Sequence, residues 1–180
     1  MTPPLNVTVL GIGLMGLPMS QRLCQAGYAV TAYNRTPSKA TPLLQNGAIL
    51  ANSPAQACAH ADVVISLLTD GDAVADMMFE QGAAAATPLG SVWIDMSSIR
   101  PDQAREHAQA LSALGVHHLD APVSGGTVGA QAGTLAIMAG GETQVLQRCT
   151  PVLSVLGRTT HVGPHGAGQL AKLANQMIVG

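Results

Sequence analysis

Short runs of β-branched and apolar residues alternate with longer, helix-compatible stretches rich in alanine and leucine along most of this sequence. The runs lie at residues 7–10, 29–33, 62–68, 91–95 and 116–120. The middle runs are apolar at nearly every position, which is typical of strands in a parallel sheet that helices cover on both faces. The alternation therefore predicts an α/β fold with a doubly wound, mostly parallel sheet.

The pattern changes after residue 120. A glycine-rich stretch covers 123–133, and a strand (134–139), a helix (142–156) and a short strand (159–162) are expected after it. Near the end, apolar residues have the spacing of one helix face: Leu170, Leu173, Ala174 and Met177. This helical pattern continues up to the last residue. We therefore predict one folded unit over 1–163, with extra strands at its C-terminal end, and the start of a further helix over 164–180.

The composition excludes several classes of protein. The 180 residues are 47% hydrophobic and 10% charged, with a formal net charge of −2, so the chain can bury a core and offers no basic surface for nucleic acid or anionic lipid. No apolar run approaches the ~18 residues of a membrane span.

The cysteines and the N-terminus bear on the compartment. The three cysteines form no Cys-x-x-Cys pair and are expected to be reduced thiols, and no basic leader precedes the first strand. A cytoplasmic protein is therefore expected.

A glycine motif lies between the first predicted strand and the first predicted helix. It consists of Gly11, Ile12, Gly13, Leu14, Met15 and Gly16 and fits G-x-G-x-x-G. In this position the first glycine allows a tight turn, the second lets the backbone approach a pyrophosphate, and the third allows close packing of helix on strand. The motif predicts a dinucleotide site of the Rossmann type; the alternative is a glycine-rich turn that binds no ligand.

The end of the second strand indicates which dinucleotide is bound. An acidic residue there would hydrogen-bond the ribose 2′-OH of NAD, but this chain has Asn34, Arg35 and Thr36. Asparagine does not repel a 2′-phosphate, and a guanidinium can bind it with two hydrogen bonds. NADP(H) is therefore favoured over NAD(H), unless Arg35 is simply a solvated surface charge.

Residues that follow later strands complete the predicted cofactor groove, because ligands collect at the carboxyl ends of strands in open α/β sheets. Leu67, Leu68 and Thr69 follow one strand, and Met96, Ser97 and Ser98 follow the next. Ser97 is the polar candidate for the nicotinamide ribose, although a serine here could equally cap a helix before Pro101.

Five segments in this order resemble the β-hydroxyacid dehydrogenase family, which includes 3-hydroxyisobutyrate dehydrogenase, tartronate semialdehyde reductase and glyoxylate/succinic semialdehyde reductase. The segments span 11–19, 95–99, 120–126, 133–141 and 166–176. The resemblance implies an NAD(P)-dependent oxidoreductase whose Rossmann domain is 1–163 and whose interdomain helix starts over 164–180, with the family's all-helical C-terminal domain absent from this chain. Residues 172–176 look most like tartronate semialdehyde reductases, whereas Asn34–Thr36 looks more like glyoxylate/succinic semialdehyde reductases.

Lys172 is the predicted catalytic residue. Hydride transfer to an aldehyde leaves charge on the carbonyl oxygen, which requires a nearby proton donor or cation. The chain has two lysines: Lys39 lies at the predicted adenosine end, and Lys172 shares a helix face with Asn175 and Gln176. The resemblance implies the same role for Lys172; the alternative is a lysine whose charge only extends from an amphipathic helix into solvent.

Ser124, Gly125 and Gly126 are the predicted substrate-carboxylate site, because closely spaced backbone N–H groups form a concavity for an anion. A loop that needs glycine only for its dihedral angles is the alternative. By resemblance, Asn175 would orient the polar oxygens of the substrate.

The remaining polar residues do not predict further chemistry. The six histidines do not form a three-ligand metal site in the sequence pattern, and Asp95 and Asp120, at strand ends, are expected to bond loop backbone rather than act as general bases. The expected function is reversible reduction of small semialdehydes by a chain that pairs as a homodimer. A dinucleotide-binding module without turnover, and an interaction protein that ignores nucleotide, are the other hypotheses.

Overall fold

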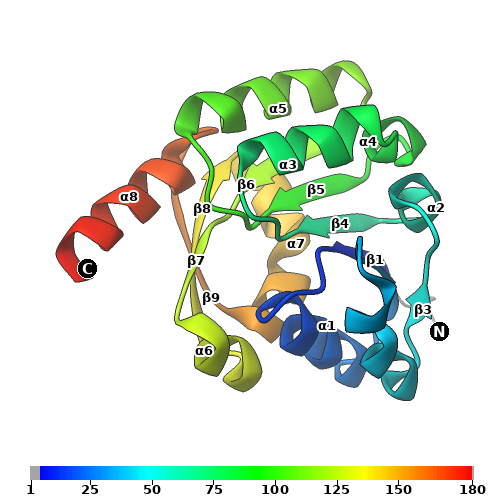
Figure 1. Ribbon diagram of the computed structural model, residues 1–180. Helices are drawn as coiled ribbons and strands as arrows, with labels where there is room; N and C mark the ends of the chain where they lie inside the picture. Colours follow the sequence, from blue (N-terminus) through cyan, green and yellow to red (C-terminus); the bar gives the residue numbers. More distant parts are fainter. Residues whose placement is uncertain (1–4, 180) are drawn as a thin grey trace.

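The computed structural model describes residues 5–179, and Figure 1 shows a single sheet with helices on both of its faces. The sheet has nine strands in the order β3-β2-β1-β4-β5-β6-β8-β7, with β9 also paired to β8. The first six strands are parallel and are β1 (Asn6–Leu10), β2 (Ala29–Tyr33), β3 (Ile49–Leu50), β4 (Val63–Ser66), β5 (Val92–Asp95) and β6 (His117–Asp120). The predicted doubly wound, mostly parallel α/β sheet is confirmed.

The strands do not alternate polar and apolar residues, because a hydrophobic core lies on each face of the sheet. Successive side chains of a strand face opposite sides of the sheet: Val9 packs in one core, and Leu10 packs in the other. On the first face lie α1 (Gly16–Gln25) and α7 (Thr143–Leu156); on the second lie α2 (Pro54–Cys58), α4 (Ala83–Ala86) and α5 (Pro101–Ala113). Each strand therefore needs apolar residues on both faces.

The shorter helical turns lie at the ends of the strands and in their connections. They are the 3₁₀ turns Pro37–Lys39 and Thr41–Asn46, the α-helix α3 (Gly71–Ala75) and the π-helical turn Asp76–Glu80 that continues it. Of the helices formed within residues 5–179, none has the length and apolar content to cross a membrane.

The extra C-terminal strands are present, and the glycine-rich stretch over 123–133 folds into regular elements. It forms β7 (Val123–Ser124) and the helix α6 (Gly126–Ala132). Gly125, Gly126 and Gly133 have positive φ angles at the two ends of this helix, and the residues between them are compatible with a helix. The glycines therefore mark boundaries of a helix rather than a continuous loop.

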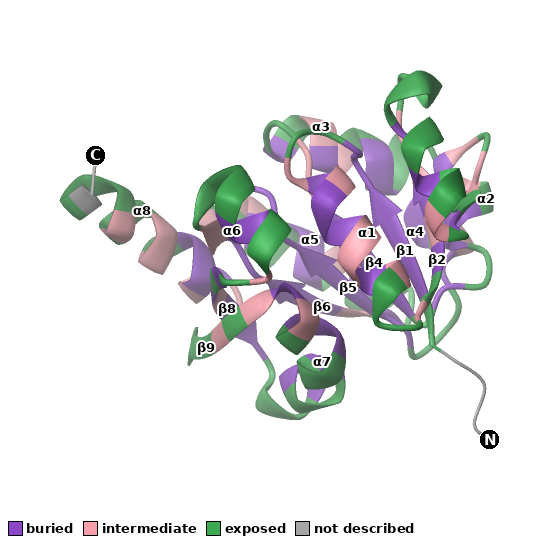
Figure 2. Ribbon diagram, turned by 90° about the horizontal axis from the view of Figure 1, so that it is seen from below, coloured by how far each residue is buried: buried purple, intermediate pink, exposed green. Residues whose placement is uncertain are grey.

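β8 (Leu135–Gly141) runs antiparallel to β6 and β7 and parallel to β9 (Gly157–Gly163). The last helix, α8 (Ala167–Val179), begins against β6 and β8 and then leaves the body of the molecule. Figure 2 shows its first turn mostly buried and its later turns made of intermediate and exposed residues.

The register of the parallel strands determines where a site can form. Leu10 pairs with Ser66, Ser66 with Asp95, and Asp95 with Asp120. The last residues of four strands therefore form one row, and the loops that follow them emerge at the same edge of the sheet.

Candidate functional site

The three glycines of the first loop have the geometry that each predicted role requires. Gly11 has a φ of +100°, and a Cβ there would overlap the carbonyl oxygen of Leu67. A Cβ on Gly16 would overlap the carbonyl oxygen of Gly11, whereas a Cβ on Gly13 would meet nothing within 4 Å. The loop is thus tightly packed at both ends and open in the middle, which fits the close approach of a pyrophosphate. Between them, Ile12 is buried, and the side chain of Leu14 is 84% exposed.

Asn34 joins this loop to the loop after β2. Its Oδ1 accepts a hydrogen bond from the Ile12 amide (2.9 Å), and its Nδ2 donates to the carbonyl oxygen of Thr36 (2.9 Å). Arg35 and Thr36, the next two residues, are exposed. The loop that carries Asn34, Arg35 and Thr36 thus lies beside the glycine loop, and the side chain that contacts the glycine loop is the Asn34 amide rather than a carboxylate.

The other predicted site residues, apart from Asn175, line one hollow of about 400 Å³, here called the lysine hollow. Its walls come from the end of the glycine loop, the loops after β4 and β5, the start of α6, and α8. The residues that line it are Met15, Leu67, Leu68, Thr69, Met96, Ser97, Ser98, Val123, Ser124, Gly125, Gly126 and Lys172. Segments from residue 15 to residue 172 thus converge at the carboxyl edge of the sheet.

Ser97 forms part of the floor of the lysine hollow and is only 1% exposed. Its Oγ accepts a hydrogen bond from the Leu68 amide (2.9 Å), and its own amide donates to Asp95 Oδ1 (3.1 Å). The alternative interpretation of Ser97 as a helix cap is wrong, because α5 begins at Pro101 and Arg100 occupies the N-cap position.

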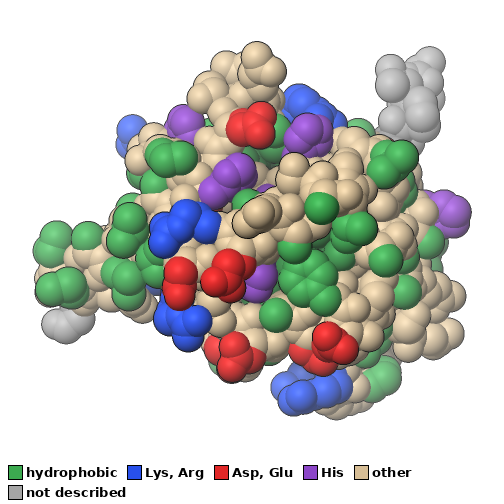
Figure 3. Space-filling model, turned by 90° about the horizontal axis from the view of Figure 1, so that it is seen from above, with side chains coloured by type: hydrophobic (Ala, Val, Ile, Leu, Met, Phe, Trp, Pro, Cys, Tyr) green, Lys and Arg blue, Asp and Glu red, His purple; other side chains and the backbone are tan. Residues whose placement is uncertain are grey.

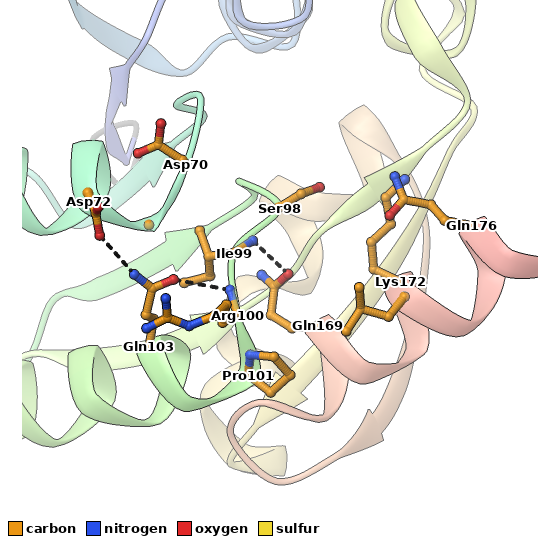
Figure 4. Close-up of a pocket in the computed structure, with 12 residues that line it drawn as sticks. Asp70, Asp72, Ser98, Ile99, Arg100, Pro101, Gln103, Gln169, Lys172 and Gln176 are labelled. Carbon is orange, nitrogen blue, oxygen red and sulfur yellow. Dashed lines mark hydrogen bonds between the residues drawn. The ribbon is translucent and has the colours of Figure 1, made fainter. Parts of the chain in front are cut away.

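Lys172 is half-buried on α8 between the lysine hollow and a second hollow of about 420 Å³. Figure 4 shows this second hollow, with Gln169 and Lys172 on successive turns of α8 beside the loop that carries Ser98 and Ile99. Asn175, one turn further along, donates from Nδ2 to Ser124 Oγ (3.3 Å). The predicted proton donor and the predicted carboxylate site therefore face the same space.

Asp95 and Asp120 are buried at the ends of β5 and β6 and do not line the lysine hollow. Burial raises the pKa of Asp95 to about 6, although hydrogen bonds from Ser97 and Ser66 act in the opposite direction. Burial also raises the pKa of Asp120, and backbone hydrogen bonds from Gly166 and Gln169 oppose that rise. Both carboxylates accept hydrogen bonds from backbone amides, as expected for structural acids at strand ends.

Gln169 is the site residue that the sequence interpretation missed. It is 1% exposed, and its amide group bonds the backbone of residues 97 and 99. The signal was its position three residues before Lys172, on the same helix face as Asn175 and Gln176. Val123 also lines the lysine hollow and was not assigned, although it lies next to Ser124 in the sequence.

The histidines show no arrangement typical of a metal centre in the part of the chain that the structure describes, where no group of three potential ligands comes together. His118 is buried and its ring lies 5.7 Å from that of His165, while His117 faces the other side of β6. Desolvation lowers the pKa of His118 to about 3, so its ring is neutral.

Comparison with known proteins identifies the family. Residues 6–163 match the family model described as the NAD binding domain of 6-phosphogluconate dehydrogenase. The chain is 42% identical over 97% of its length to 3-hydroxyisobutyrate dehydrogenase of Pseudomonas aeruginosa and 39% identical over 94% to 2-hydroxy-3-oxopropionate reductase of Escherichia coli, and covers 59% of each. The solved structure of Mycobacterium tuberculosis 3-hydroxyisobutyrate dehydrogenase with L-serine superposes with a TM-score of 0.94 at 38% identity, over 98% of this chain and 60% of that one.

The chain thus spans about 59% of the length of the curated relatives that it matches. The matched part includes the whole nine-stranded sheet and the glycine loop, and the resemblance stated from the sequence is confirmed. The chain belongs to the β-hydroxyacid dehydrogenase family, and residues 6–163 are its NAD-binding domain.

Proposed function

We propose that this chain binds NADP(H) in preference to NAD(H) and takes part in the reversible reduction of small semialdehydes. Tartronate semialdehyde and the oxidation product of 3-hydroxyisobutyrate are the first substrates to test, and glyoxylate and succinic semialdehyde are the second group. The observation that supports this proposal is the lysine hollow, where Lys172, Ser124–Gly126 and the loops after β4 and β5 meet.

The chain's own residues divide the chemistry among them. A bound reduced nicotinamide supplies the hydride. Lys172 would donate a proton to the carbonyl oxygen of the substrate during reduction, and it would accept that proton in the reverse oxidation. The backbone amides of Gly125 and Gly126 and the hydroxyl of Ser124 would hold the substrate carboxylate, with Asn175 orienting its remaining oxygens.

The preference for NADP(H) is proposed from the adenosine end. The side chain of Asn34 hydrogen-bonds the Ile12 amide of the glycine loop and the carbonyl oxygen of Thr36. β2 contains no carboxylate that would repel a phosphate at its end. The exposed guanidinium of Arg35 is free to reach a 2′-phosphate. We expect Arg35→Gln to weaken NADPH binding about tenfold and to leave NADH binding unchanged, measured by equilibrium titration. NADH binding at least as tight as NADPH binding to the unaltered chain would show that this interpretation is wrong.

Turnover is tested by mixing the chain with NADPH and each of the four semialdehydes or oxo acids in single-turnover absorbance measurements. Oxidation of NADPH with one of them supports the reductase. Tight binding of NADPH without oxidation favours the second hypothesis, a dinucleotide-binding module without turnover. The exposed later turns of α8 support that alternative, because water exclusion from the lysine hollow would need further cover.

We also propose that the chain forms a homodimer through α8. Leu170, Leu173 and Met177 are 56%, 48% and 88% exposed along this helix. Figure 3 shows hydrophobic side chains gathered on the projecting helix, while on the rest of that face acidic and basic side chains are interspersed. A contiguous apolar surface of this kind is typical of an interface.

A further inference from the structure

The first turn of α8 is held on the sheet by a carboxylate from β6. Asp120 is fully buried; its Oδ1 accepts a hydrogen bond from the Gly166 amide (2.8 Å), and its Oδ2 accepts one from the Gln169 amide (3.2 Å). Amides at the start of a helix have no partner within the helix, and a negative charge there is favoured by the helix dipole. Asp120 therefore anchors the start of α8 from outside the helix.

Gln169 makes a second attachment, to the loop after β5. Its Oε1 accepts a hydrogen bond from the Ile99 amide (3.1 Å), and its Nε2 donates to the carbonyl oxygen of Ser97 (2.8 Å). Figure 4 shows the bond to Ile99. Because the side chain is only 1% exposed, loss of this amide would leave two buried backbone groups without their partners.

These bonds continue to the predicted cofactor groove. Ser97 accepts a hydrogen bond from the Leu68 amide through Oγ and one from Gln169 through its carbonyl oxygen. Lys172 follows Gln169 by three residues, which places it on the next turn of the same helix face. The loops after β4 and β5 are thus joined by a short series of hydrogen bonds to the helix that carries the lysine.

We propose that Gln169 is a positioning residue for Lys172: by bonding the backbone of Ser97 and Ile99, it fixes the rotation of α8 and holds the Lys172 ammonium in the lysine hollow. The inference rests on the proposed function, since the position of Lys172 matters only if the dinucleotide binds beside it. It adds a role for a residue that would not itself touch the substrate.

The two lysines of the chain make a direct test possible. The chain is acylated with limiting acetic anhydride, with and without saturating NADPH, and the modification at Lys172 and Lys39 is measured by mass spectrometry. In the unaltered chain, NADPH is expected to slow acylation of Lys172 several-fold. Gln169→Met retains the size of the side chain but neither hydrogen bond, so this protection should be lost while NADPH binding weakens less than about threefold.

Two further variants separate positioning from a general loss of stability. Thr8→Val removes a different buried hydrogen bond, from Thr8 Oγ1 to the carbonyl oxygen of Ala57 (2.6 Å), and should preserve protection of Lys172. Gln169→Glu has the shape of glutamine and loses the donor to the Ser97 carbonyl, so it should lose protection at pH 8 even if Gln169→Met does not fold.

The outcomes distinguish the two proposals. If NADPH does not protect Lys172 in the unaltered chain, the proposed function fails. If the unaltered chain shows protection, and a folded Gln169 variant with NADPH bound shows the same protection, only the positioning role is overturned. Equal loss of protection in Thr8→Val would also overturn it, because the effect would then follow stability alone.

Discussion

At the residue scale, Lys172 carries the most direct consequence for activity. Lys172→Met removes the proton donor and keeps the aliphatic part of the side chain, so reduction should slow by about 10²–10⁴-fold while NADPH binding changes little. Single-turnover absorbance and equilibrium titration measure the two effects separately. Lys39→Met is the matched control, and it should retain the full rate of reduction. Equal losses of binding and of turnover in Lys172→Met would indicate a structural lysine instead.

Asp95 gives a prediction about stability and pH. Its pKa is about 6 in the folded protein against an ordinary value of 3.8, so between these values the folded chain keeps a proton that the unfolded chain has lost. The free energy of unfolding therefore falls as pH rises through this window. Above about pH 6 the folded protein bears the full destabilisation caused by the buried, ionised Asp95. We expect Asp95→Asn to be more stable than the unaltered chain at pH 7–8, by on the order of 2 kcal/mol, with no advantage below pH 4.

Urea unfolding at a series of pH values measures this difference. The single tryptophan is a suitable probe, because Trp93 is buried and its Nε1 donates to Ser66 Oγ (2.9 Å), which in turn donates to Asp95 Oδ1 (2.9 Å). The lowered pKa of His118 gives the opposite slope, with stability rising between about pH 3 and its ordinary value of 6.5. That contribution is common to both proteins and cancels in the difference. Parallel pH curves for the two proteins would contradict the prediction.

At the scale of elements, the glycine loop separates a structural requirement from a binding requirement. Gly16→Ala places a Cβ against the carbonyl oxygen of Gly11 and should destabilise the fold by about 1–3 kcal/mol. Gly13→Ala meets no atom within 4 Å, so the fold should keep its stability while dinucleotide binding weakens. Thermal unfolding and NADPH titration of the same two variants test this. Normal NADPH binding by a stable Gly13→Ala variant would show that no pyrophosphate approaches this backbone.

The elements themselves were largely predictable, because an apolar run or a helix face is a local pattern. The strand predicted over 29–33 is β2 as observed, and the other predicted strands differ from the observed ones only at their ends. The two-residue strands β3 and β7 and the helix α6 were not predicted. β3 is held by pairing with β2, and α6 lies between glycines that dominated the local composition, so neither has a strong pattern of its own.

At the scale of the whole molecule, the exposed side of α8 predicts association. Native mass spectrometry should find pairs of the unaltered chain, and the double variant Leu173→Glu, Met177→Glu should be a folded single chain, since the side chains of Leu173 and Met177 are 48% and 88% exposed within one chain. Single chains of the unaltered protein at micromolar concentration would contradict the homodimer.

The succession of strands and helices along the chain and the glycine motif were evident from the sequence alone, because hydrophobic spacing and turn-forming residues act over a few positions. Only the tertiary structure decided that Lys172 lies beside Ser124 and the loop after β5. That placement depends on the strand register that aligns Ser66, Asp95 and Asp120, and on the buried hydrogen bonds of Asp120 and Gln169 to distant backbone. These hydrogen bonds join residues 46 to 72 positions apart, a separation at which local patterns in the sequence carry no information about direction or distance.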